Sequence, residues 1–219
     1  MIVLGFDTAT AASAVAISAG GRVRGELRDD PAPGAHPGHA TRLLHMAHAL
    51  LTETGVAWRE LDRIAAGVGP GAFTGLRVGV ATARGLAASL SAELVGVSSL
   101  QALATPALSS AAATGEPSMR VLSVIDARRG EAFACAYERS GESAPRALGE
   151  PAAFAPEDLG AVIERAHAGG AAARGAWLAV GDGAVRFRAS LEAVGVEVPP
   201  DADALHRVRA GDILSLIHI

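Results

Sequence analysis

The chain has 219 residues, a formal net charge of −4 and a sequence pI near 6.0, which exclude unaided nucleic-acid binding through a broad basic surface. No charge-free apolar run reaches the ~18 residues that span a bilayer. The only cysteine is Cys135, so no disulfide forms within the chain, and no basic, apolar leader follows Met1. We therefore expect a cytoplasmic α/β protein with no membrane segment, long enough for one large domain or two lobes.

The first half alternates strand and helix patterns. An apolar strand ends at Asp7 and a second strand returns beside it. Leucine and alanine then recur at helical spacing up to Gly55, a residue typical of the position just after a helix. The predicted elements are strands over 2–6, 14–18, 61–68 and 94–97, and helices over 39–54 and 75–90.

A glycine turn over 67–71 joins the third strand to the second helix. Such a turn exposes consecutive backbone N–H groups at a helix N-terminus, where they can hold a phosphate or a partner's carboxylate. The alternative, which the residues by themselves favour, is a tight connection that binds nothing. The glycine spacing matches neither G-x-x-x-x-G-K-[ST] nor G-x-G-x-x-G, which excludes a P-loop and a Rossmann fingerprint.

Small residues form a row on the helix that follows this turn. Gly75, Gly79, Ala83 and Ala87 are spaced four apart and share one face. A row of this kind allows another helix to approach closely. It serves either packing inside its own domain or a subunit interface, and the sequence leaves both open.

The pattern restarts in the second half. An apolar strand over 121–126 ends at Asp126, a turn follows, and 131–137 alternates as a returning strand. With an offset of 119 residues Asp126 superimposes on Asp7, which indicates an internal duplication. The chain therefore divides into an N-terminal lobe, a linker rich in alanine, serine, glycine and proline, and a smaller C-terminal lobe, with bounds 1–106, 107–118 and 119–213.

Five segments carry a family resemblance. FDTAT, VGPGAFTGLRVGVATARGLA, LVGVSSLQALA, VIDARRGEAFACAY and VGDG occur in the order found in the TsaB family, and the match runs from Ile2 to about Gly183. The resemblance implies a two-lobed actin/hexokinase/Hsp70-like (ASKHA) fold. TsaB proteins are partner subunits of the bacterial complex that forms threonylcarbamoyladenosine in tRNA, next to the anticodon.

The related catalytic subunit, TsaD, carries His-x-x-x-His on the helix after the strand that matches 94–97. Here Ser99 and Leu103 stand at those two positions, and leucine cannot ligate a metal. The resemblance thus implies a non-catalytic subunit without a cofactor of its own. Its implied partners are a TsaD-type subunit, a TsaE-type ATPase and tRNA through the complex, or a second copy of the chain. A small-molecule kinase or ATPase of the same fold is the alternative.

Two sets of site residues follow. The strand-end aspartates either position a nucleotide-bound metal, as in ATP-using relatives, or cap their turns, and the resemblance favours the second role. The predicted vestigial phosphate loops comprise Asp7, Thr8, Asp126, Gly181 and Gly183. The predicted helical interface with the partner comprises Leu43, Ala47, Leu50, Gly75, Gly79, Thr82, Ala83 and Leu86.

Two features remain outside this interpretation. The four histidines His36, His39, His45 and His48 lie close together in sequence, but no His-Glu-x-x-His motif supports the metal site of a peptidase, so we interpret them as solvated or interface residues. Residues 214–219, LSLIHI, depart from the family, and we interpret them as an artefactual tail translated from adapter DNA.

Overall fold

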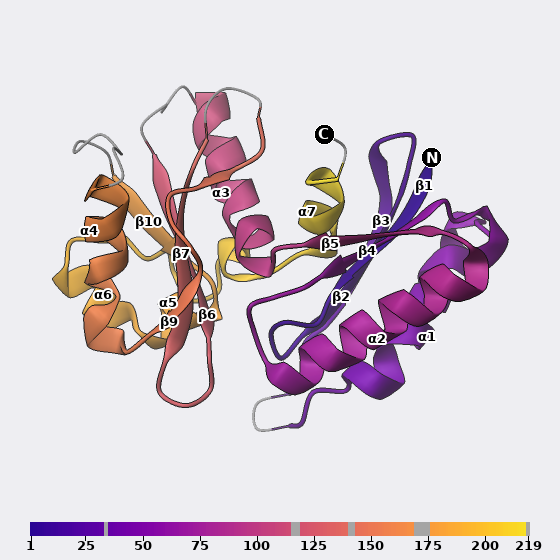
Figure 1. Cartoon of the computed structure of the whole chain (residues 1–219), viewed down its shortest axis with the longest axis horizontal. Helices are drawn as coiled ribbons and strands as arrows, with labels where there is room; N and C mark the ends of the chain where they lie inside the picture. The colour runs from indigo at the N-terminus through magenta and orange to yellow at the C-terminus, as the bar shows by residue number, and fades with distance from the viewer. Residues whose placement is uncertain (33–34, 115–118, 140–142, 169–175, 218–219) are drawn as a thin grey trace. The chain divides into compact units, whose positions relative to one another are not determined.

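The computed structural model describes residues 1–32, 35–114, 119–139, 143–168 and 176–217. The chain forms two compact units (Figure 1). Unit 1 comprises Met1–Ser99 with Val208–Ile219, and unit 2 comprises Leu100–Arg207. Each unit is built on its own β-sheet, and among the described residues no helix is long and apolar enough to cross a membrane.

The sheet of unit 1 has the strand order β3-β2-β1-β4-β5. The first three strands are an antiparallel meander, whereas β4 and β5 run parallel to β1, which places the carboxyl ends of β1 and β4 at one edge of the sheet. Every residue of β1 after Ile2 is buried, including Asp7 at its end. The strands are β1 (Ile2–Asp7), β2 (Ser13–Ala19), β3 (Arg22–Asp29), β4 (Arg63–Gly67) and β5 (Glu93–Val97).

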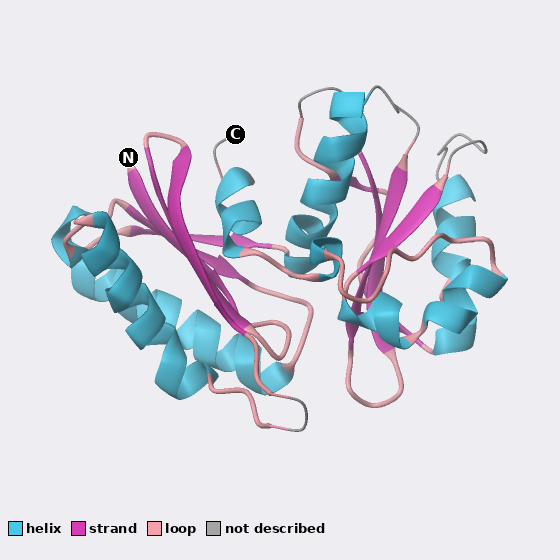
Figure 2. Ribbon diagram, turned by 180° about the vertical axis from the view of Figure 1, so that it is seen from behind, coloured by secondary structure: helices cyan, strands magenta, loops and turns pink. Residues whose placement is uncertain are grey.

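Helices cover both faces of this sheet (Figure 2). On one face lie α1 (His39–Thr54) and α2 (Phe73–Leu90), and the core between them and the sheet includes Phe6, Ile17 and Leu50. Gly55 ends α1 in the left-handed conformation, with φ 70°, as the sequence predicts. The 3₁₀ turn η1 (Trp58–Glu60) connects α1 to β4.

Unit 2 contains a sheet of order β10-β6-β7-β8, in which β9 also pairs with β7. Its core joins this sheet to α4 (Gly160–Ala168) and α5 (Asp182–Arg186) through Leu122, Ala166 and Ala184. The strands are β6 (Arg120–Asp126), β7 (Ala132–Glu138), β8 (Arg146–Ala147), β9 (Ala152–Phe154) and β10 (Trp177–Val180). The helices are α3 (Ser99–Thr114), η2 (Pro156–Asp158), α4 (Gly160–Ala168), α5 (Asp182–Arg186), α6 (Arg188–Ala193) and η3 (Ala204–His206).

The predicted duplication is confirmed in the topology. Each unit begins its sheet with an antiparallel hairpin, β1-β2 or β6-β7, and the first strand of each hairpin pairs in parallel with a later strand. The hairpin loops, 8–12 and 127–131, are equally long, and Asp7 and Asp126 both occupy the last position of their strand.

The predicted linker over 107–118 is wrong for the residues that the structure describes. Residues 107–114 form the second half of α3, and Ala107, Leu108 and Ala111 are buried. Alanine is the best helix former, and a buried apolar face stabilises the helix beyond its propensity. The division into units instead falls between Ser99 and Leu100.

The chain returns to unit 1 at Val208, so the predicted second lobe over 119–213 ends too late. The helix α7 (Ala210–Ser215) packs on the face of the sheet opposite α1 and α2 (Figure 2). Leu214 is fully buried there, and a Cβ on Gly5 would lie 2.7 Å from its Cδ2 atom. Burial of Leu214 does not depend on where the sequence of residues 214–219 comes from. The artefactual origin of these residues therefore stays a prediction.

The packing of α7 gives a stability prediction. Leu214→Ala should lower the free energy of unfolding by about 2–4 kcal/mol, because it leaves a cavity against β1. Leu216→Ala removes the same atoms from a partly exposed residue two positions away and should cost much less. Urea unfolding of both variants measures the difference, and equal losses would contradict this packing of α7.

Candidate functional site

The Asp7 carboxylate at the end of β1 is enclosed by its own unit. The Ser99 hydroxyl donates to Asp7 Oδ2 over 2.5 Å, and the Ala9 amide donates to Oδ1 over 2.8 Å. A Cβ on Gly67 would lie 1.8 Å from Asp7 Oδ2, so only glycine fits beside it on β4. Burial raises the pKa of Asp7, and the hydrogen bonds from Ser99 and Ala9 act in the opposite direction.

Several backbone donors in and next to the glycine turn bond to protein atoms. The Val68 amide donates to the Val97 carbonyl over 2.9 Å, and the Gly69 amide donates to Ser99 Oγ over 3.2 Å. The Ala72 amide donates to the Ala9 carbonyl over 2.7 Å. These bonds support the second interpretation of the turn, a tight connection, because amides bonded to protein atoms do not also hold a phosphate.

The small-residue row on α2 packs inside unit 1. A Cβ on Gly75 would lie 2.1 Å from the Thr8 carbonyl oxygen, and one on Gly79 would lie 2.3 Å from Thr8 Oγ1. The Thr8 hydroxyl in turn donates to the Gly75 carbonyl over 2.8 Å. The row therefore lets α2 approach the loop after β1, and Ala83 continues it into the core.

Most of the predicted partner interface is accordingly wrong. The buried members contact this chain's own sheet and loop, so they offer no surface to a second protein, and they are Leu43, Ala47, Leu50, Gly75, Gly79 and Ala83. The spacing on α1 and α2 correctly predicts a packed face, but the face packs on the sheet of unit 1. Thr82 and Leu86 are partly exposed, and their contact with a partner stays a prediction.

The turn after β6 repeats the arrangement with different partners. Arg186 Nη1 donates to Asp126 Oδ2 over 2.7 Å, and the Arg128 amide donates to Oδ1 over 2.9 Å. The Asp126 amide donates to Asp182 Oδ1 over 3.0 Å, and burial raises the pKa of Asp182. A Cβ on Gly181, whose φ is 113°, would lie 2.0 Å from the Val124 carbonyl oxygen.

Each carboxylate already has partners within its own unit. The Ser99 hydroxyl donates to Asp7, and the Arg186 guanidinium pairs with Asp126. Within the described part of the chain no three histidine, cysteine or acidic side chains come close enough to share a metal. The roles of the vestigial phosphate loops stay predictions, with turn capping as the chemistry that the contacts support.

The four histidines are dispersed in the structure. His39 is buried and its Nδ1 lies 2.8 Å from Ser13 Oγ, and burial lowers its pKa. His45 and His48 are exposed on α1, where His45 Nδ1 contacts the Thr41 carbonyl and His48 stacks on Trp58. His36 is exposed in the preceding loop. This geometry supports packing and surface roles for the four residues.

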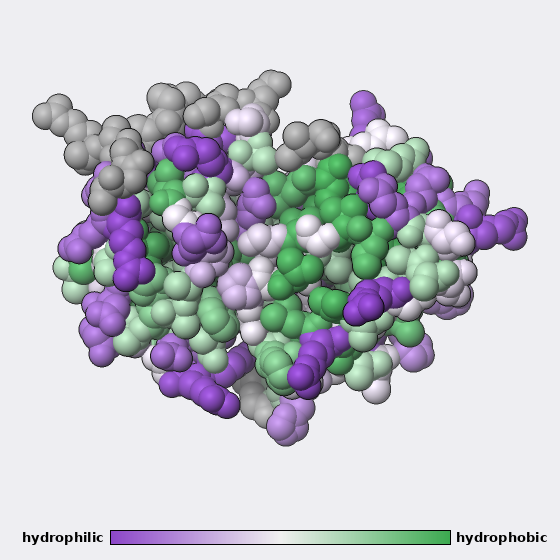
Figure 3. All heavy atoms as spheres, in the orientation of Figure 1, coloured by the Kyte–Doolittle hydropathy of each residue, from purple (hydrophilic) through white to green (hydrophobic). Residues whose placement is uncertain are grey.

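The sequence interpretation missed the outer face of α2. Phe73, Leu76 and Val80, spaced three and four apart, line an apolar groove of about 330 Å³ together with Ala81 and the arginines that flank them. Phe73 is 66% exposed, although the Arg77 guanidinium lies 3.8 Å from its ring centroid. Figure 3 shows apolar side chains over α2 among hydrophilic ones. The spacing of these three residues could have indicated a second apolar face on α2. The sequence interpretation considered only the glycine and alanine row on the other face.

The Asp7 contacts give a pH-dependent prediction. Ser99→Ala removes the hydroxyl donor, so the pKa of Asp7 should rise further in the folded state. Where the buried carboxylate is ionised it lacks its donor, so the loss of stability should grow as the pH rises, to about 2–3 kcal/mol. Below the unfolded value of about 3.9 the carboxyl is protonated in both states, and the loss should shrink.

A double-mutant cycle with Asp7→Asn isolates this contact. Chemical unfolding near pH 7 and near pH 4 should show that Ser99→Ala costs less in the Asp7→Asn background. A cost that is independent of pH and of residue 7 would contradict the assigned hydrogen bond.

Comparison with known proteins places the chain among relatives. Residues 33–193 match the model of the family described as TsaD, tRNA N6-adenosine threonylcarbamoyltransferase. The tRNA threonylcarbamoyladenosine biosynthesis protein TsaB of Escherichia coli is 37% identical over 139 residues, which cover 64% of this chain and 56% of that protein. TsaB of Bacillus subtilis is 36% identical over 101 residues, which cover 46% and 41%. The matches thus span about half the length of these curated relatives.

Solved structures agree in fold. YeaZ from Pseudomonas aeruginosa superimposes with a TM-score of 0.73 at 30% identity, over 98% of this chain and 89% of that chain. The ethanolamine utilization protein EutJ from Carboxydothermus hydrogenoformans, at 13% identity and a TM-score of 0.53 over 99% and 90%, shares the fold alone. The fold is the predicted actin/hexokinase-like (ASKHA) fold. The chain therefore belongs to the tRNA N6-adenosine threonylcarbamoyltransferase (TsaD) family and, within it, to the TsaB (YeaZ) proteins.

Proposed function

We propose that this chain is a non-catalytic subunit in the synthesis of threonylcarbamoyladenosine in tRNA, where it binds and activates a TsaD-type threonylcarbamoyltransferase. The observation that carries the proposal is the state of the two strand-end carboxylates. Asp7 is bonded to Ser99 and Asp126 to Arg186, so each is already satisfied by its own unit. Such carboxylates stabilise turns and are poorly placed to hold a nucleotide or a catalytic metal.

The outer face of α2 is our candidate for the surface that contacts the partner. Large apolar side chains exposed beside arginines are typical of interface centres, which are enriched in aromatic residues and arginine. Phe73, Leu76 and Val80 offer this composition, with Arg77 and Arg84 at the sides of the groove. The same face also suits a symmetric homodimer, because a two-fold interface pairs one surface with itself.

Binding of the TsaD-type subunit tests this surface. Val80→Asp places a charge in the apolar groove and should weaken the complex at least about 30-fold, because an interface core does not tolerate an unpaired charge. Val23→Asp is the control, since it makes the same change at an exposed valine of unit 1 that lies on β3, whereas Val80 is partly exposed on α2. Calorimetric titration of each variant with the TsaD-type subunit of the same organism measures the change in affinity.

Function is tested by threonylcarbamoyl transfer to unmodified tRNA. Activity should require both subunits and should fall with Val80→Asp but not with Val23→Asp. Circular dichroism shows whether both variants stay folded. Tight binding by Val80→Asp would place the interface elsewhere, and full transfer activity without this chain would overturn the proposed activating role.

We propose further that the chain binds no nucleotide of its own and acts in the cytoplasm, and that a TsaE-type ATPase and tRNA join through the complex. Titration of the isolated chain with Mg-ATP should give no saturable heat up to about 1 mM, a concentration at which a functional nucleotide site would be filled. Micromolar binding would instead favour the kinase or ATPase alternative. In that case Asp7 or Asp126 would exchange its protein partner for the bound nucleotide.

A further inference from the structure

A small pocket opens at the edge of the sheet in unit 2, and it originates in the strand register. β8 pairs Ala147 with Tyr137 of β7, and β9 pairs Ala152 with Ala134. From the first pair to the second, β7 advances by three residues, whereas the segment from β8 to β9 advances by five. Two extra residues of that segment therefore bulge away from β7 between the two short strands. The pocket occupies the space beside this bulge, next to Cys135, and has a volume of about 270 Å³.

The interior of the pocket is mainly apolar. Its walls come from the sheet edge, the bulge and α4, and they include Leu148, Phe154 and Val162. Cys135 closes one side, where its thiol donates to the Gly149 carbonyl over 3.3 Å and is thereby occupied. The volume lies just below the range of about 300–1,000 Å³ that holds drug-sized ligands, so the pocket suits a smaller molecule.

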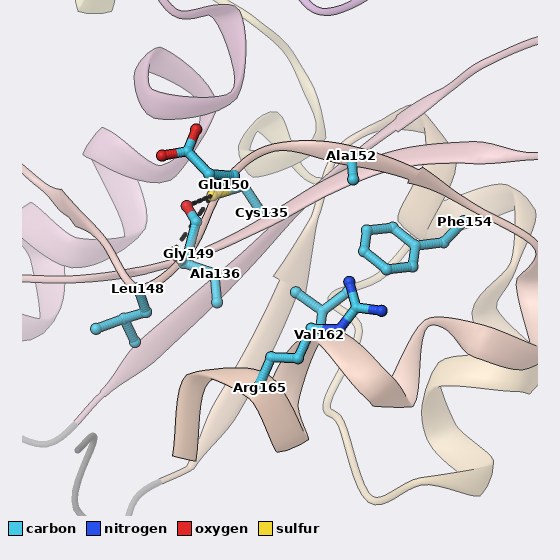
Figure 4. Close-up of a pocket in the computed structure, with 9 residues that line it drawn as sticks. All are labelled: Cys135, Ala136, Leu148, Gly149, Glu150, Ala152, Phe154, Val162 and Arg165. Atoms are coloured by element: carbon cyan, nitrogen blue, oxygen red, sulfur yellow. Dashed lines mark hydrogen bonds between the residues drawn. The ribbon is translucent and has the colours of Figure 1, made fainter. Parts of the chain in front are cut away.

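Arg165 supplies the one cation among the residues that line the pocket. Its guanidinium lies 5.3 Å from the Phe154 ring centroid, and Figure 4 shows it beside Val162 and Phe154. The Glu150 carboxylate points away from it in the same view, and within the described part of the chain Arg165 forms no ion pair. A guanidinium held over an aromatic ring keeps its N–H donors in place for an anion.

We propose that this pocket binds a small organic monocarboxylate whose apolar body fills the space between the sheet edge and α4 and whose carboxylate pairs with Arg165. A body of this kind covers apolar walls, and a guanidinium matches a carboxylate in charge and in planar geometry. The site lies within unit 2 and is independent of the α2 face and of the two turns.

Benzoate and benzamide are a matched pair of probes, because they have the same shape and differ in charge. In amide NMR spectra, benzoate should shift the signals of Gly149, Glu150 and neighbouring pocket residues with a Kd of about 0.1–5 mM, as expected for so small a ligand. Benzamide should bind at least about tenfold more weakly. The absence of pocket shifts with about 20 mM benzoate would overturn the site.

Two arginine variants test the role of the guanidinium. Arg165→Gln, at an exposed position, should keep the fold and weaken benzoate binding about tenfold or more. Arg129→Gln removes the same charge from the exposed β6-β7 turn and should leave binding unchanged. Equal affinity for benzoate and benzamide, or unchanged benzoate binding by Arg165→Gln, would overturn the carboxylate assignment. Neither result affects the proposed tRNA-modification role.

Discussion

Enclosure of the Asp7 carboxylate is the constraint on which unit 1 depends. A carboxyl group this deeply buried is costly unless its oxygens accept hydrogen bonds, and here a serine hydroxyl and a backbone amide supply them. The approach of β4 requires glycine at position 67, and the approach of α2 to the next residue requires glycines at 75 and 79. One buried acid and its neighbours therefore fix the glycine turn, the row of small residues and the position of α2 together.

The second unit solves the same problem with different chemistry. The first strand of its hairpin also ends in an aspartate, Asp126. Here Arg186 from α5 pairs with the Asp126 carboxylate, and a second acid, Asp182, accepts a hydrogen bond from the Asp126 amide. The two units therefore share one topology but stabilise their turns with different side chains. Strand-end acids that are satisfied within their own units agree with our proposal that catalysis belongs to a partner subunit.

The two faces of α2 have separate physical requirements. The inner face must be small, because Thr8 lies against it, whereas the outer face carries the exposed Phe73 and the partly exposed Leu76 and Val80. A substitution on the inner face disturbs the packing of unit 1, whereas the outer face is the part of α2 that a partner can reach.

The sequence by itself determined the strand–Asp–turn–strand repeat, the two long helices of unit 1 and the family, because hydrophobic periodicity and turn glycines act over short distances. It did not reveal β3, whose edge position tolerates polar residues such as Arg24 and Glu26, or the return of α7 to unit 1. Tertiary structure alone decided what the packed side of each helix contacts: Leu43 and Gly79 face the chain's own sheet and loop, and Phe73 faces outward. A small or apolar row specifies close packing, but the partner in that packing depends on residues far away in the sequence.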